Sequence, residues 1–140
     1  MKPFEYMEHT ADAEFFAYGK TLEEAFTNAV YASMNIVCDH LKVSPKIKKN
    51  VTISAADNQA LLYSFIEEFI FLLDAEDFLL SKIDEIKIEE KDSKWHLNAN
   101  VSGDVAQNYE TEKAIKAATY NNMEISKEGD TWKLHVVIDI

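Results

Sequence analysis

Carboxylate groups near the two ends of the sequence could together bind a metal ion. Asp12 closes the stretch Glu8-His9-Thr10-Ala11-Asp12, and Asp139 precedes Ile140, the last residue of the sequence. If folding places the final residues beside this stretch, the two aspartates and the terminal carboxylate of Ile140 converge. Three oxygen donors suit a hard cation such as calcium, magnesium or manganese. The alternative is that Asp12 caps a turn and Asp139 ends a strand, and the spacing alone favours this alternative.

Other catalytic patterns do not occur in the sequence. The three glycines are isolated, which excludes a phosphate-binding loop and a dinucleotide-binding fingerprint. No cysteine cluster or His-x-x-x-His pair indicates a zinc site, and no serine lies in a nucleophile-elbow motif. His40, His96 and His135 are scattered, and each is interpreted as a surface or core-edge histidine. A metal-dependent hydrolase that uses the carboxylates stays open as a weak alternative, because no nucleophile or general base accompanies them.

Strands are expected to position both aspartates. Aromatic residues concentrate at residues 3–8 and 13–19, which predicts two short strands joined by a turn that contains Asp12. Residues 132–140 alternate between apolar and other side chains, which predicts a last strand with Asp139 on its less apolar face.

Two helices are predicted between these strands. Thr21 and Glu24 form a capping box, which starts a helix that should run to about Cys38. Asp57 or Asn58 offers the N-cap of a second helix. The inward face of this helix is predicted to contain Leu61, Leu62, Phe65, Phe69, Leu72 and Leu73, and its solvent face Glu67, Glu68 and Asp74.

The remaining segments predict mainly strands. Residues 51–55 alternate, residues 91–94 form the turn of a hairpin, and residues 127–130 form another turn. Residues 103–115 show no regular pattern. The order β-β-α-β-α followed by strands predicts one α+β domain, residues 1–140. It is expected to be a two-layer sandwich in which two helices cover one face of a mainly antiparallel or mixed sheet.

The charge of the chain limits its partners. Its 14 basic residues are all lysines, and its 25 acidic residues give a net charge of −11. Arginine is preferred for bidentate contact with phosphate and guanine. An acidic chain without arginine is therefore a poor candidate for binding nucleic acid by itself. A cationic protein partner or metal ions fit this composition better.

The sequence also predicts a soluble, cytoplasmic protein without a membrane partner. No signal-like apolar run begins the sequence. The longest apolar stretch, residues 61–73, contains two glutamates and is too short to span a bilayer. Cys38 is the single cysteine, so no internal disulfide forms, and a buried, unreactive thiol is expected.

Four segments together resemble the archease family along nearly the whole chain. They are Glu8-His9-Thr10-Ala11-Asp12, Ala17–Phe26, Lys116–Tyr120 and Val136–Ile140. The His-Thr-Ala-Asp turn combined with the terminal Asp-Ile is specific, whereas each segment alone is weak evidence. The resemblance implies that Asp12, Lys116 and Asp139 are functional. It also implies that Asp12, Asp139 and Ile140 bind a divalent cation, with calcium expected first and magnesium or manganese as alternatives.

The resemblance implies an accessory protein of the RNA-splicing ligase, which joins a 2′,3′-cyclic-phosphate or 3′-phosphate RNA end to a 5′-hydroxyl end in tRNA splicing. An archease promotes guanylylation of the active-site histidine of the ligase, supports its multiple turnover and can broaden the nucleotides that it accepts. Such a protein is not itself an enzyme, and it meets tRNA through the ligase. A more general protein chaperone or modulator of RNA processing stays open as the alternative.

The sequence departs from the family pattern at two places. Asn121 stands where many relatives have histidine, and Asn108-Tyr109 stands where an Arg-His pair is common. Asp12, Lys116 and Asp139 follow the pattern.

Overall fold

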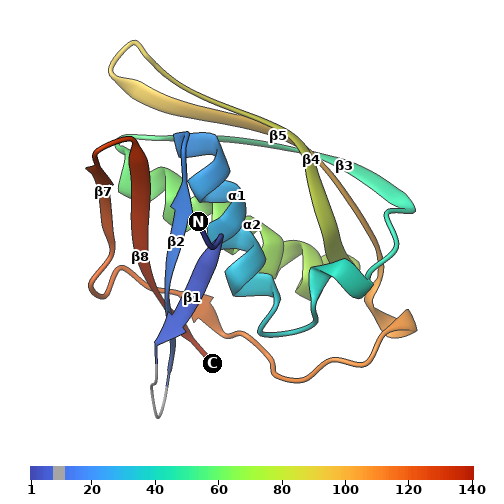
Figure 1. Cartoon of the computed structure of the whole chain (residues 1–140). Coiled ribbons are helices and arrows are strands. Elements are labelled where there is room, and N and C mark those ends of the chain that lie inside the picture. Colours follow the sequence, from blue (N-terminus) through green and yellow to red (C-terminus); the bar gives the residue numbers. More distant parts are fainter. Residues whose placement is uncertain (8–11) are drawn as a thin grey trace.

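The structure is a computed structural model that describes residues 1–7 and 12–140. In these residues the chain forms two α-helices, eight β-strands and two short 3₁₀ helices (Figure 1). The helices are α1 (Leu22–Met34), α2 (Asn58–Glu76), η1 (His40–Lys42) and η2 (Ala106–Asn108). The strands are β1 (Phe4–Met7), β2 (Asp12–Gly19), β3 (Ile47–Ala55), β4 (Phe78–Lys91), β5 (Lys94–Val105), β6 (Ala117–Ala118), β7 (Glu124–Glu128) and β8 (Thr131–Asp139).

The strands form two antiparallel sheets where the sequence predicted one. Among the described residues, one sheet has the order β1-β2-β8-β6, with β7 also paired to β8, and the other has the order β3-β5-β4. The α+β class and the antiparallel pairing are therefore confirmed. The division into two sheets was not predictable, because the alternation of a strand indicates its two faces and not its neighbours.

The two helices pack against strands of both sheets, so the sheets share one core. α1 contacts β1, β2, β8 and β4, and α2 contacts β3, β4, β5, β6 and β7. The inner face of α1 is apolar, and its residues Ala25, Phe26 and Ala29 are completely buried. The rings of Phe26 and Phe65 stack between the helices with centroids 6.4 Å apart. Burial of one such side chain stabilises the fold by roughly 1.5–3 kcal/mol.

Local hydrogen bonds explain where the helices begin. Thr21 Oγ1 accepts a hydrogen bond from the Glu24 amide at 3.1 Å, as the capping box predicted. Asp57 Oδ1 accepts one from the Ala60 amide at 2.7 Å and caps α2. These bonds satisfy N–H groups that have no partner inside the helix.

The first helix ends at Met34, earlier than the predicted end at about Cys38. Beyond Met34 the chain continues in turns, with the Val37 and Cys38 amides both donating to the Met34 carbonyl. Cys38 is buried, as predicted, and burial raises the pKa of its thiol. No helix within residues 1–7 and 12–140 has the length and apolar composition needed to cross a bilayer. The cytoplasmic location stays a prediction.

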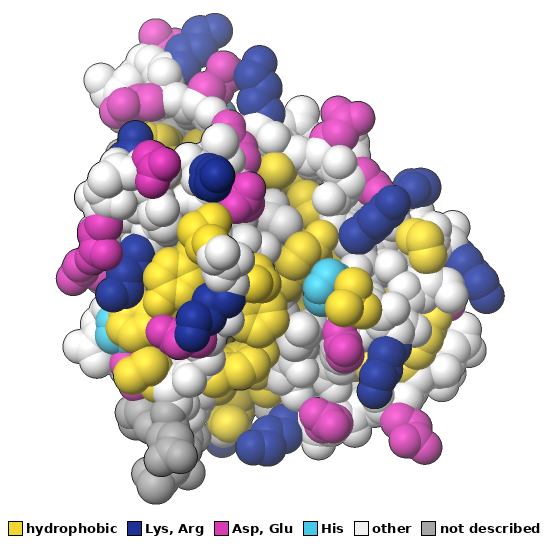
Figure 2. All heavy atoms as spheres, in the orientation of Figure 1, with side chains coloured by type: hydrophobic (Ala, Val, Ile, Leu, Met, Phe, Trp, Pro, Cys, Tyr) yellow, Lys and Arg dark blue, Asp and Glu magenta, His cyan; other side chains and the backbone are white. Residues whose placement is uncertain are grey.

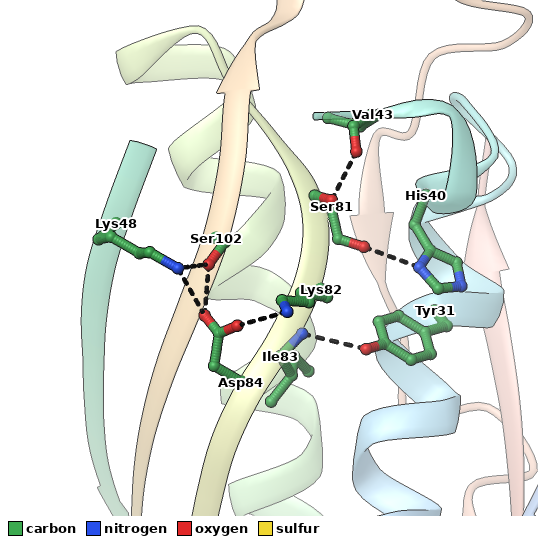
Figure 3. Close-up of polar contacts among 9 residues, drawn as sticks. All are labelled: Tyr31, His40, Val43, Lys48, Ser81, Lys82, Ile83, Asp84 and Ser102. Carbon is green, nitrogen blue, oxygen red and sulfur yellow. Dashed lines mark hydrogen bonds and ion pairs between the residues drawn. The ribbon is translucent and has the colours of Figure 1, made fainter. Parts of the chain in front are cut away.

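Two bulges in β4 direct polar groups toward neighbouring elements (Figure 3). Ser81 and Asp84 are the extra residues of these bulges. The Ser81 carbonyl accepts a hydrogen bond from His40 Nδ1 at 2.8 Å. Asp84 accepts a hydrogen bond from the Ser102 hydroxyl, and the Lys48 ammonium lies 3.8 Å away. The Ser102 hydrogen bond, and then the charge of Lys48, lower the pKa of Asp84, so this carboxylate stays ionised.

Candidate functional site

Strands β2 and β8 place the two predicted aspartates directly opposite each other. Asp12 is the Cα partner of Asp139 in this antiparallel pair. Opposite residues of such a pair face the same side of the sheet, with Cβ atoms about 4.5–5.5 Å apart. Figure 1 accordingly shows the C-terminus close to the end of β2 where Asp12 lies. The rest of the predicted motif, residues 8–11, falls outside the described residues, and the role of the aspartates as metal ligands stays a prediction.

The main chain holds Lys116 next to Asp139. The Lys116 amide donates a hydrogen bond to the Asp139 carbonyl at 2.8 Å. Ala117, the next residue, is the Cα partner of Asp139 in the β6–β8 pair. The Lys116 side chain is exposed, and in the described part of the chain its ammonium forms no ion pair with Asp12 or Asp139. The fold therefore fixes the backbone of Lys116 at the site and leaves its side chain exposed.

A hollow of about 340 Å³ opens beside Asp12 and is lined by both polar and apolar residues. Glu14 and Ile140 line it together with Asp12, and so do Tyr6 and Met7. Tyr6 and Met7 are 49% and 43% exposed. In Figure 2, hydrophobic side chains gather on the face where β1 and β2 lie. An exposed apolar surface of this kind beside polar groups is common at protein-binding sites.

Carboxylate oxygens, such as those of Asp12 and Asp139, are ligands of the kind that a hard cation prefers. Like charges directly opposite each other in a sheet destabilise it, and a divalent cation between Asp12 and Asp139 would remove that repulsion. Within the described residues, no three His, Cys, Asp or Glu side chains gather closely enough to bind a metal. Further oxygens would have to come from water or from Ile140, a residue that lines the same hollow as Asp12.

A second polar pair on the same face of the sheet was missed from the sequence. His135 Nε2 contacts Glu14 Oε2 and thus connects β8 with β2. The His135 ring also packs on Phe16, with centroids 4.5 Å apart. Glu14 follows Asp12 by two residues and His135 precedes Asp139 by four, so the alternation of each strand puts these side chains on one face. Only the register between the strands brings the histidine to the glutamate.

Tyr109, at one of the departures from the family pattern, connects the end of β5 with the loop that follows η1. Its hydroxyl donates a hydrogen bond to Asp104 Oδ2 at 2.7 Å and accepts one from the Ser44 amide at 3.0 Å. Asp104 is only 4% exposed. The Tyr109 hydrogen bond, followed by one from the Val105 amide and by the charge of Lys46, lowers the pKa of Asp104.

Tyr109→Phe is expected to reduce the free energy of unfolding by about 1–3 kcal/mol at pH 7, because the buried Asp104 and the half-buried Ser44 amide each lose a hydrogen-bond partner. A carboxylate with a lowered folded-state pKa stabilises the fold above its unfolded-state pKa, and this contribution disappears as the pH falls through the folded-state pKa. The difference between wild type and variant in the free energy of unfolding, measured with urea, should therefore become smaller below about pH 4. Tyr120→Phe is the matched control, since no hydrogen bond of the Tyr120 hydroxyl exists among the described residues. An equal difference at pH 7 and pH 3 would contradict the role of Asp104.

Comparison with known proteins places the chain in a family. The family model of the Archease protein family matches residues 4–140. Over 141 residues the chain is 37% identical to the protein archease of Methanosarcina acetivorans, covering 99% of this chain and 97% of the relative. This chain belongs to the archease family.

Solved structures extend the archease comparison to the fold. The solution structure of Methanobacterium thermoautotrophicum protein 1598 matches with a TM-score of 0.85 and 34% identity, and all of both chains is covered. A crystal structure from Thermotoga maritima, described as an archease and possible chaperone, has a TM-score of 0.58 and 20% identity. It covers 96% of this chain and 94% of its own, and at this identity it shows the shared fold alone.

Proposed function

We propose that this protein is an accessory protein of an RNA-splicing ligase and acts on it through Asp12, Lys116 and Asp139. The observation that carries the proposal is the pairing of Asp12 with Asp139 across β2 and β8, with the Lys116 amide bonded to Asp139. Membership of the archease family, the net charge of −11 and the apolar surface around Tyr6 and Met7 support a protein partner.

The proposed site holds one divalent cation through Asp12, Asp139 and the carboxylate of Ile140. Calcium is the first candidate, and magnesium and manganese are the alternatives. Such a cation supplies a concentrated positive charge that attracts phosphate oxygens. The exposed ammonium of Lys116 adds a second positive charge beside it, suited to a phosphate of the nucleotide on the ligase. The two aspartates hold the cation in place and offset its charge.

In this proposal the surface that contains Asp12 and Asp139 docks near the nucleotide site of the ligase. It promotes guanylylation of the active-site histidine, so that the ligase turns over repeatedly, and it can broaden the nucleotides accepted. The chain performs no bond chemistry itself. Its contact with tRNA runs through the ligase, in keeping with a chain that has no arginine.

A ligation assay tests the proposed function directly. A cognate ligase is incubated with GTP, a divalent cation and RNA ends that carry a 2′,3′-cyclic phosphate and a 5′-hydroxyl. Substoichiometric amounts of this protein are expected to increase both the guanylylated ligase and the product formed per ligase molecule several-fold. The same protein after heat denaturation is the control. Unchanged guanylylation and turnover would show that the proposal is wrong.

A general chaperone is the second candidate, since the relative from Thermotoga maritima is described as a possible chaperone. A pull-down from cell extract separates the two, because an accessory protein of the ligase should recover the ligase as its dominant partner. Phosphatase and nuclease assays with added manganese test the weaker alternative of a metal-dependent hydrolase. Activity that disappears in Asp12→Asn would favour this alternative.

A further inference from the structure

The short strand that follows Lys116 depends on support from outside its sheet. β6 consists of Ala117 and Ala118, which pair with Asp139 and Ile138 of β8. The Ala118 amide does not extend this ladder. It donates instead to Glu67 Oε2 of α2, at 2.8 Å. Two paired residues form a marginal strand by themselves, so contacts with the rest of the fold must keep it in place.

Three side chains of α2 contact the segment that begins at β6. Gln59, Tyr63 and Glu67 are four residues apart and therefore lie along one side of the helix. Glu67 accepts the hydrogen bond from Ala118, and the Tyr63 ring stacks on that of Tyr120, with centroids 4.3 Å apart and planes 6° apart. The third contact is a hydrogen bond of 3.5 Å from Gln59 Nε2 to the Met123 carbonyl.

This arrangement corrects the expectation that Glu67 belongs to the solvent face of its helix. Glu67 is half-buried, and its carboxylate accepts a main-chain hydrogen bond that its charge strengthens. Ala118 is buried, so water does not readily replace this acceptor. Loss of the carboxylate oxygen would therefore free the segment from α2 at this point.

We infer that Glu67 and Tyr63 are positioning residues, which set the place of Lys116 relative to Asp139. The Lys116 amide is bonded to Asp139 only two residues before the Ala118 amide is bonded to Glu67. Movement of Ala118 away from α2 thus loosens the backbone of Lys116 at the site. This inference rests on the proposed function, because it concerns how the site acts on the ligase.

Two pairs of variants test the inference in the ligation assay. Glu67→Ala removes the acceptor, whereas Glu67→Gln keeps an oxygen at the same place without the charge. Glu67→Ala is expected to lower the stimulation of guanylylation by about tenfold, since small misplacements have effects of at least this size. Glu67→Gln is expected to retain most of the stimulation. Tyr63→Ala and Tyr63→Phe form the second pair, because phenylalanine keeps the stack on Tyr120.

Amide hydrogen exchange of the free protein provides a readout that does not depend on the ligase. The Ala118 and Lys116 amides should exchange faster in Glu67→Ala and return toward wild type in Glu67→Gln. Asp74→Ala, at an exposed position of the same helix, is the matched control and should change neither exchange nor stimulation. If Glu67→Ala does not fold, the Tyr63 pair supplies the same comparison.

The outcomes separate this inference from the proposed function. Faster exchange with unchanged stimulation overturns the inference and leaves the proposed function standing. Equal losses in Glu67→Gln and Glu67→Ala also overturn it, because they indicate that the charge acts and not the acceptor. If the wild-type protein fails to stimulate the ligase, the proposed function is wrong, and so is this inference, which rests on it.

Discussion

Asp12→Asn and Asp139→Asn are each expected to lower the stimulation of ligase guanylylation by about tenfold or more. Asparagine keeps the size of the side chain and one oxygen but removes the charge that a cation needs. Changes outside the ligand shell already reduce metal affinity 10- to 100-fold, so the loss of a ligand charge should cost at least as much. The double variant should lose little more than either single variant, because two ligands of one ion act as a unit. Initial rates of guanylylation at a fixed ligase concentration provide the measurement.

Addition of a cation should reverse the order of stability between these variants and the wild type. With a chelator present, each variant is expected to be at least as stable as wild type, since the repulsion between Asp12 and Asp139 is gone. A cation at about 100 times its dissociation constant stabilises the wild type by about 2.7 kcal/mol. For a chain of this size, that corresponds to a rise in Tm of about 10 °C. The variants should show little of this rise.

Thermal unfolding with calcium, magnesium or manganese therefore checks both the site and the identity of the ion. Glu90→Gln, an exposed position of β4, is the matched control and should keep the full rise in Tm. Variants of Asp12 and Asp139 that keep both the cation effect and the stimulation would show that the site lies elsewhere. Stimulation lost without any cation effect would indicate that the carboxylates contact the ligase directly.

The helices were well predicted because their signals are local. The caps at Thr21 and Asp57 and the apolar period of each helix lie within short windows of sequence. The hairpin of β4 and β5 was predicted, but the first half of β4 was missed. Its first residues, Phe78–Leu80, form a continuous buried run that periodicity does not distinguish from the end of a helix. The two sheets were missed for a related reason, since strand order depends on pairings between distant segments.

The candidate site shows the same limit. The residue types at Asp12 and Asp139 indicated cation chemistry, but spacing favoured two unrelated roles until the register of β2 and β8 placed them together. Glu67 was assigned to a solvent face because a helical pattern does not reveal which strand covers that face. The contact of Glu14 with His135 likewise depends on two strands that are 121 residues apart. The chemistry of these side chains could thus be predicted from the sequence, but their convergence in space could not.

Gly103→Ala is expected to destabilise the fold by about 3 kcal/mol or more, because β5 has no space for a side chain at this position. Gly103 lies opposite Leu80 of β4 and Ile47 of β3. An added Cβ would lie 2.1 Å from the Leu79 carbonyl oxygen and 2.6 Å from the Phe78 ring. Neither neighbour can move cheaply, since one is backbone and the other is a buried ring. Thermal unfolding should show Tm lower by about 10 °C or more.

Gly129→Ala is the matched control for this glycine. Gly129 has a φ of +64°, which costs about 1–2 kcal/mol with an L side chain, but no atom lies within 4 Å of the added Cβ. A similar loss in both variants would show that the contacts around Gly103 are not the cause. Gly103 lies in the β3-β5-β4 sheet, whereas Asp12 and Asp139 lie in the other. The Gly103 variant, assayed below its Tm, should therefore stimulate the ligase as well as wild type does per folded molecule. Asp139→Asn should behave in the opposite way, because it should lose stimulation while keeping its stability in the absence of a cation. The two variants therefore distinguish loss of the fold from loss of the site.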